Sequence, residues 1–192
     1  MGQQREDWLV LDQDECWFSR FVAPALSAWS ANRLRVITRD ARQQPTPAVA
    51  GYGARRTDTR QVYLAICEGQ PKSEYTWDFL QGLLAVARQE HTRVLVLIWD
   101  NATWHLSKRL RSWMRAYNQQ AKQTGDVRLL IHYLPSRSPW LNPLEGCWLH
   151  AKRAVWEPTR LLELDELIQR ILAYFRVQPS PLPFNLCLPI QH

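Results

Sequence analysis

The stretch "VLVLIWDNATWH", Val94 to His105, constrains the fold of this chain more than any other segment. Its first six residues carry no charge and do not alternate apolar with polar, which is typical of a strand buried on both faces of a sheet. We expect it to be the central strand of that sheet. Asp100 then stands at the tip of the strand, where it either caps the "DNAT" turn or belongs to a functional site.

Other segments predict the remaining strands of a mixed sheet. The segment "DWLVLDQDECWFSRF" is rich in aromatic and β-branched residues and predicts a first strand. Alternating runs at Leu34 to Thr38 and Val62 to Ile66 predict antiparallel strands. "VRLLIHYLP" predicts another buried strand that ends at Pro135. We expect four residues to act as strand breakers in the loops: Pro45, Pro47, Gly51 and Gly53.

Apolar spacing predicts four helices. They cover residues 76–87, a segment after the candidate N-cap Ser107, a segment opening at "NPLEGCW", and Leu164 to Phe175. Antiparallel strands followed by strand and helix alternation predict an α/β protein with a mixed sheet flanked by helices, forming one domain over residues 1–176. Residues 177–192 are rich in proline and predict an extended or loosely attached tail.

The charge balance favours a polyanionic partner. The 192 residues carry a formal net charge of +6, and most of the surplus is arginine, which suits bidentate contact with phosphate. Composition alone does not separate a nucleic-acid-binding protein from a merely basic soluble one.

Secretion and membrane insertion are not expected. The start "MGQQREDW" has no apolar core of signal-peptide type, and no run of about 18 apolar residues could cross a bilayer. The cysteines are scattered without zinc-site spacing or a readable disulfide framework, so we expect reduced thiols in a cytoplasmic protein. They are Cys16, Cys67, Cys147 and Cys187.

Three acidic residues, Asp14, Asp100 and Glu145, lie in or next to predicted strands and helices. Asp14 lies in the first strand, where Asp12 shares its face and Glu15 takes the other. A solvated strand end is the plain explanation for Asp14. Glu145 also has a local explanation, because Asn142 fits an N-cap and Glu145 then occupies the position of a capping-box glutamate.

Taken together, these acids favour a metal site. A mixed sheet would bring Asp14, Asp100 and Glu145 to one edge, where their charges would raise one another's pKa unless a cation lay between them. Carboxylate oxygens suit Mg²⁺ or Mn²⁺. A pair of such ions is the usual device for in-line displacement at phosphorus.

Three blocks of the sequence resemble the DDE transposases of bacterial insertion sequences related to mariner elements. They are "DECWFSRFVAPALSAW", "LIWDNATWHLSKRLRSWM" and "LPSRSPWLNPLEGCWLHAKRAV", and the likeness extends from Trp8 to Phe175. The resemblance implies an RNase H-like fold and a catalytic, metal-binding triad of Asp14, Asp100 and Glu145. Asp12 is the rival for the first position, and Asp14 is preferred because the family motif places the ligand directly before a glutamate. Two ions, Mg²⁺ or Mn²⁺, are implied as cofactors.

The resemblance also implies partners and supporting residues. Asn101 and His105 are expected to orient Asp100 or to touch DNA, although His105 could equally be a histidine hydrogen-bonded at a helix start. Trp140 could pack against a base or a ribose, or belong to the core. Double-stranded DNA, as transposon ends and target, is the expected partner, bound by a homodimer with target sites of TA type in the bacterial nucleoid. The expected phosphate contacts are Arg109, Arg111, Arg115, Arg137, Lys152 and Arg153.

Two departures from the family leave alternatives open. Members usually carry an N-terminal helix-turn-helix region that recognises the transposon ends, and this chain starts directly at the catalytic blocks. Such a region would have to come from a separate subunit, or the chain is a truncated, non-autonomous DNA-binding remnant without independent catalysis. The segment after Phe175 also differs from the family's usual ending. A structure-selective nuclease of the same fold is a third, weaker hypothesis.

Overall fold

A seven-stranded mixed sheet forms the centre of the computed structural model, which describes residues 7–20, 47–101, 105, 107–136, 138–157 and 160–190. The strand order is β5-β4-β1-β2-β3-β7-β6. β1 runs parallel to β4, β4 runs parallel to β5, and the other neighbours are antiparallel. The strands are β1 (Trp8–Phe18), β2 (Val49–Arg56), β3 (Val62–Glu68), β4 (Val94–Trp99), β5 (Arg128–Tyr133), β6 (Val177–Pro179) and β7 (Cys187–Pro189). The strand expected at residues 34–38 lies outside the described residues.

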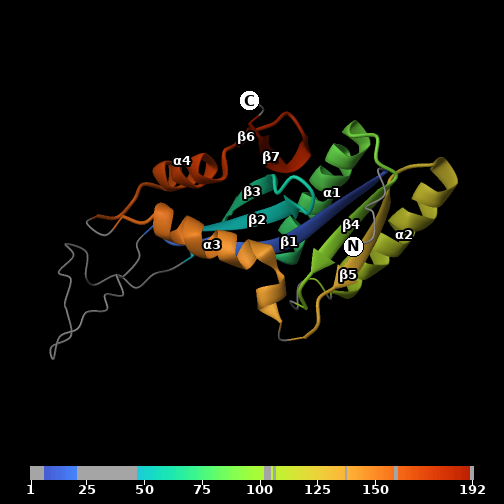
Figure 1. Ribbon diagram of the computed structural model, residues 1–192, viewed down its shortest axis with the longest axis horizontal. Helices are drawn as coiled ribbons and strands as arrows, with labels where there is room; N and C mark the ends of the chain where they lie inside the picture. Colours follow the sequence, from blue (N-terminus) through green and yellow to red (C-terminus); the bar gives the residue numbers. More distant parts are fainter. Residues whose placement is uncertain are drawn as a thin grey trace.

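Helices flank both faces of the sheet (Figure 1), as the α/β prediction requires. The four helices are α1 (Ser73–Gln89), α2 (Lys108–Thr124), α3 (Pro143–Ala154) and α4 (Leu164–Phe175), with two short 3-10 turns, η1 (Pro139–Leu141) and η2 (Pro183–Asn185). Ser107 is the N-cap of α2, and its hydroxyl accepts a hydrogen bond from the Leu110 amide. None of the helices in the described residues combines the length and apolarity needed to cross a membrane.

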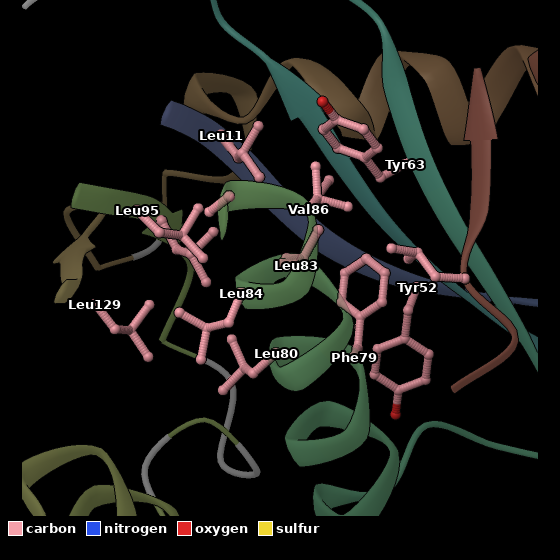
Figure 2. Packing of buried hydrophobic residues seen from close by; sticks show 14 of the residues in the cluster. Leu11, Tyr52, Tyr63, Phe79, Leu80, Leu83, Leu84, Val86, Leu95 and Leu129 are labelled. Atoms are coloured by element: carbon pink, nitrogen blue, oxygen red, sulfur yellow. The ribbon is translucent and has the colours of Figure 1, made fainter. Parts of the chain in front are cut away.

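Two hydrophobic clusters hold the layers together. The larger one lies between the sheet and helices α1 and α2, and Figure 2 shows Leu83 and Phe79 of α1 pointing toward the sheet beside Tyr52 of β2. The smaller one lies on the opposite face, where Leu144 and Trp148 of α3 pack against β1, β2 and β3. Side chains therefore alternate along β1 between the two clusters.

The predictions for β4 and β5 need correction. Leu95, Leu97 and Trp99 are fully buried, but the alternate side chains of β4, among them Val96, are only half-buried. β4 is an internal strand next to the edge rather than the central one, and β5 is the edge strand, with every second residue exposed. The second face is less covered because α3 makes its main contacts with β1 and β2 rather than with β4.

The C-terminal segment is part of the sheet and not a loosely attached tail. β7 pairs with β3 through Cys187 and Leu64, and β6 pairs with β7. Val177 and Leu186 are buried, and η2 packs against α1. The prolines fit because each strand is short and ends at a proline, where a missing amide hydrogen disturbs few ladder hydrogen bonds. The boundary expected at residue 176 does not separate this segment from the sheet.

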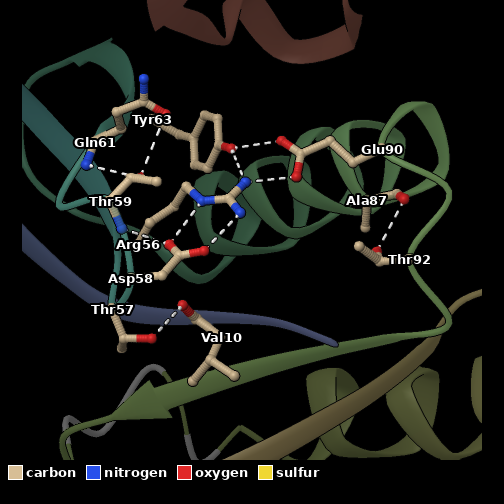
Figure 3. A network of polar contacts seen from close by, with 10 residues as sticks. All are labelled: Val10, Arg56, Thr57, Asp58, Thr59, Gln61, Tyr63, Ala87, Glu90 and Thr92. Atoms are coloured by element: carbon tan, nitrogen blue, oxygen red, sulfur yellow. Dashed lines mark hydrogen bonds and ion pairs between the residues drawn. The ribbon is translucent and has the colours of Figure 1, made fainter. Parts of the chain in front are cut away.

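A network of polar side chains lies beside the turn between β2 and β3 (Figure 3). The Arg56 guanidinium binds both Asp58 carboxylate oxygens at 2.9 Å and also donates to Tyr63 and Glu90. Tyr63 donates in turn to Glu90 at 2.8 Å. The network therefore joins the β2–β3 turn to the C-terminal end of α1.

Gly51 and Gly53 lie inside β2 and do not break it, contrary to the prediction. Both face α3, and a Cβ atom at Gly53 would stand 2.7 Å from Cζ2 of the Trp148 indole. Glycine in a strand interior often marks such a close approach of another group. The absence of a side chain at Gly53 thus lets α3 lie close to the sheet.

We predict that Gly53→Ala destabilises the protein by about 1–3 kcal/mol, because the added methyl group overpacks the contact with Trp148. Chemical denaturation measures the change. Gly146→Ala on α3 is the control: it meets no atom within 4 Å and should raise stability by up to about 1 kcal/mol. Equal stabilities of Gly53→Ala and the wild type would contradict this packing.

Candidate active site

The parallel register of β1 and β4 brings two of the predicted acids to the same edge. Asp12 pairs with Ile98, so Asp14 stands two residues beyond this pair on β1 and Asp100 stands two residues beyond it, directly after β4. Asn142, the N-cap of α3, donates from its side chain to the Gln13 carbonyl oxygen at 3.1 Å. This bond places the start of α3, and with it Glu145, beside Asp14.

Asp14 is a buried carboxylate surrounded by other acids. Its side chain accepts hydrogen bonds from the Trp148 indole at 3.1 Å and the Glu15 amide at 2.9 Å. Burial, followed by repulsion from Glu15, Glu145 and Asp100, raises the pKa of Asp14 to about 8. The repulsion indicates that Asp100 and Glu145 each lie near Asp14.

Asp12, the rival for the first position, has a different environment. It is also buried, but the Arg55 guanidinium of β2 lies 3.7 Å from its carboxylate. Burial raises the pKa of Asp12, and Arg55 acts against that rise. Asp12 thus has a cation beside it, whereas no Lys or Arg ion pair with Asp14 occurs in the described residues. This contrast favours Asp14 as the metal ligand.

Asp100 is held by a buried histidine. His105 Nδ1 lies 3.0 Å from the Asp100 carboxylate, and His105 Nε2 lies 2.8 Å from the Glu15 carboxylate. Burial alone would lower the pKa of His105, but its hydrogen bonds to Asp100 and Glu15 outweigh burial and raise that pKa to about 9. At neutral pH the ring is therefore a cation that hydrogen-bonds to Glu15 through Nε2 and lies within ion-pair distance of Asp100 through Nδ1.

Asn101, the residue after Asp100, makes a hydrogen bond to the backbone of the neighbouring segment. Its side-chain amide donates to the Leu134 carbonyl oxygen at 2.8 Å, which joins the segment after β4 to the segment after β5. Asn101 thus supports the backbone beside Asp100.

Glu15 is the site residue that the sequence reasoning missed. The alternation of β1 placed it correctly on the face opposite Asp14, yet gave it no role. That face carries the buried Leu9 and Leu11, so a glutamate in the same row requires a buried partner. This need for a buried partner is the feature of the sequence that could have identified Glu15 as a site residue.

Glu145 opens α3 as its third residue and is exposed. Asn142 caps the helix by accepting from the Leu144 amide at 3.1 Å. Among the hydrogen bonds of the described residues, the Glu145 carboxylate accepts none from the Asn142 amide. A capping box therefore does not account for Glu145.

The donor set suits a hard divalent cation. Asp14, Asp100 and Glu145 offer only carboxylate oxygens, and their mutual repulsion would be relieved by positive charge between them. As placed, no three His, Cys, Asp or Glu side chains of the described residues are arranged to hold an ion. The three acids are therefore of the kind that binds a hard divalent cation, although their side chains do not form a coordination shell.

Basic residues lie on two helices that start at this edge. Arg109, Arg111 and Arg115 are exposed on α2, and Lys152 and Arg153 are exposed in the last turn of α3. The Lys152 ammonium lies 5.2 Å from the centre of the Trp17 ring. Arg137 falls outside the described residues.

Trp140 lies in η1, just before α3, and is 74% exposed. Such exposure is incompatible with the core role that was one of its two explanations. The four cysteines are all free thiols.

The fold is shared with mariner transposase structures. The Mos1 transposase paired-end complex with left transposon end has a TM-score of 0.61 and 16% identity, with 86% of this chain and 47% of that chain covered. The Mos1 paired-end complex with Mg has a TM-score of 0.53 and 19% identity, with 87% of this chain and 48% of that chain covered. The complex with Mn has a TM-score of 0.52 and 15% identity, with 86% and 52% covered. The chain thus spans about half the length of these proteins and has their RNase H-like fold.

No curated protein has significant sequence similarity to this chain. A family model described as DDE superfamily endonuclease matches residues 7–168, which include Asp14, Asp100 and Glu145. The chain belongs to the DDE superfamily endonuclease family.

Proposed function

We propose that this chain is the catalytic domain of a DNA transposase that cuts and joins DNA with two divalent cations, Mg²⁺ or Mn²⁺. The observation that carries the proposal is that Asp100 and Glu145, from the end of β4 and the start of α3, both act electrostatically on the buried Asp14 of β1. Family membership and the likeness to transposase complexes that contain Mg or Mn support it.

Each acid has a proposed role. Asp14, Asp100 and Glu145 would supply the carboxylate oxygens that hold the ions. When bound, the ions would supply positive charge for the attacking and the leaving oxygens. Asp14 sits on a rigid strand and Asp100 directly follows one, so these ligands are held before substrate arrives.

The proposed reaction exchanges phosphodiester bonds. A water oxygen bonds to phosphorus at the transposon end, and the bond from phosphorus to the 3′ oxygen breaks to leave a 3′-hydroxyl. That hydroxyl then attacks a phosphodiester of the target DNA, and a 3′-hydroxyl of the target leaves. No covalent bond to the protein is needed, so the residues of this chain mainly position the DNA and stabilise charge.

Arg109, Arg111 and Arg115 of α2, with Lys152 and Arg153 of α3, are the proposed contacts to DNA phosphates. Because α2 begins soon after Asp100 and α3 carries Glu145, both helices start at the proposed catalytic edge. We also propose a homodimer on transposon ends, which the likeness to paired-end complexes supports.

Each of Asp14→Asn, Asp100→Asn and Glu145→Gln is expected to lower Mg²⁺-dependent cleavage of end-containing DNA by at least about 10³-fold, or about 4 kcal/mol of barrier. Nicking assays on purified protein measure the rate, and DNA binding should be retained. Glu68→Gln, an exposed glutamate at the end of β3, is the control and should keep the wild-type rate.

Cleavage that persists in Asp100→Asn would contradict the assignment of Asp100. Calorimetry that finds no Mn²⁺ binding, together with salt-sensitive DNA binding, would instead favour the non-catalytic remnant.

The metal-free protein is expected to lose stability as pH rises. Unfolded Asp14 releases its proton near its ordinary pKa of 3.8, whereas the folded group holds it to about 8, so deprotonation between these values favours unfolding. We expect the melting temperature in chelator to fall by roughly 10 °C from about pH 5 to about pH 7.5. Thermal melts measure the change, and Mg²⁺ should reverse much of it.

Asp14→Asn is the matched control for this pH dependence, because it keeps an oxygen for the Trp148 indole and cannot ionise. Its melting temperature should vary much less over the same range. An equal slope for the variant and the wild type would rule out Asp14 as the cause.

Arg111→Ala is expected to weaken binding to duplex DNA by a similar factor for all sequences. If Arg111 contacts one phosphate, the slope of log affinity against log salt should become shallower by about 0.9. Fluorescence anisotropy at several salt concentrations measures it. Arg160→Ala is the control, since the Arg160 guanidinium is already paired with Glu166. A change in slope for Arg160→Ala as large as that for Arg111→Ala would overturn the proposed α2 contact.

A further inference from the structure

Three side chains from separate parts of the chain form a continuous polar connection beneath the catalytic edge. Glu15 comes from β1, Asp100 follows β4, and His105 lies in the connection before α2. The Glu15 carboxylate lies 2.8 Å from His105 Nε2, and the Asp100 carboxylate lies 3.0 Å from His105 Nδ1. The connection therefore runs from one strand to the next through a single imidazole ring.

Exposure increases along this connection from the core to the surface. The side chains of Glu15 and His105 are 1% and 0% exposed, while that of Asp100 is 43% exposed. Burying a charged pair contributes little net stability, and a well-packed apolar pair of the same volume is often at least as stable. A buried glutamate on the apolar face of β1 therefore points to a purpose other than stability.

The contacts of the His105 ring indicate what Glu15 does, because they fix the orientation of the ring. The His105 imidazole is stacked on the Trp99 indole, with 4.4 Å between ring centres and 17° between planes. Stacking fixes the plane of the ring, and the contact with Glu15 fixes its rotation within that plane. A ring held in this way keeps Nδ1 at 3.0 Å from the Asp100 carboxylate.

We propose that Glu15 is a positioning residue for the catalytic centre, acting through His105 to hold the Asp100 carboxylate in one orientation. This inference rests on the proposed role of Asp100 as a metal ligand. Groups behind a ligand commonly act in this way, and their removal costs about 10- to 100-fold in metal affinity. Glu15 itself does not touch metal or DNA.

The test measures Mn²⁺ affinity of the metal-free protein by calorimetry, which needs no catalytic turnover. We expect Glu15→Ala to weaken Mn²⁺ binding by about 10- to 100-fold, with unchanged affinity for DNA. In cleavage assays, kcat should fall while KM for DNA stays the same. Glu15→Gln keeps an acceptor for the His105 ring and should restore part of the Mn²⁺ affinity.

A double-mutant comparison separates positioning from general damage to the fold. If Glu15 acts only through His105, adding Glu15→Ala to His105→Ala should cause no further loss of Mn²⁺ affinity. Glu68→Ala, at an exposed strand end, is the control and should bind Mn²⁺ like the wild type. Circular dichroism identifies any variant that fails to fold, and Glu15→Gln then provides the measurement.

The outcomes distinguish this inference from the proposed function. Loss of Mn²⁺ affinity in Asp100→Asn, with wild-type affinity in both Glu15 variants, would overturn the positioning role and leave the metal site intact. Wild-type Mn²⁺ affinity in Asp100→Asn would overturn the assignment of Asp100 itself, and the positioning role with it. Additive losses in the double variant would show that Glu15 does not act through His105.

Discussion

The parallel pairing of β1 with β4 is the constraint on which the rest of this structure depends. Main-chain hydrogen bonds set the register in which Leu11 faces Leu97 and Asp12 faces Ile98. The same register buries Leu11 and Leu97 against α1 and α2 and carries Asp14 and Asp100 to one edge. A slip of one residue would turn Asp14 toward the apolar cluster and Glu15 toward α3. The packing of the core and the geometry of the acidic site are therefore one property of the sheet.

The three acidic side chains of β1 have different surroundings, although they lie within four residues of one another. Asp12 lies near the Arg55 guanidinium, Glu15 is paired with His105, and Asp14 faces the other acids and has no ion pair with Lys or Arg in the described residues. The raised pKa of Asp14 follows from this difference. Neighbouring carboxylates can thus form a structural ion pair, a proposed positioning group and a proposed metal ligand, because the strand turns them toward different surroundings.

Local patterns in the sequence predicted much of the fold. The apolar spacing of α4 gave its limits, Leu164 to Phe175, and the serine before α2 gave its N-cap. Strand alternation also predicted that Glu15 lies on the face opposite Asp14. These predictions succeed because periodicity and capping depend on residues close together in the chain.

The errors concern properties that depend on distant residues. The apolar run of β4 does not reveal that α3 covers other strands, so the less covered face of β4 could not be predicted. Prolines concealed β6 and β7, which form because β3 offers them an edge. The Glu15 to His105 contact joins residues 90 positions apart, and only the folded chain brings them together.

The docking of α3 links the packing of the sheet to the chemistry of the site. The helix carries Glu145 near its start and Trp148 one turn later, and the Trp148 indole both fills the space over Gly53 and donates to Asp14. A side chain at Gly53 would move the indole, and Glu145 belongs to the same rigid helix. The position of Glu145 relative to Asp14 is therefore set by a contact with a residue that has no side chain. This explains why a glycine in a strand, which weakens the strand locally, can be useful beside an acidic site.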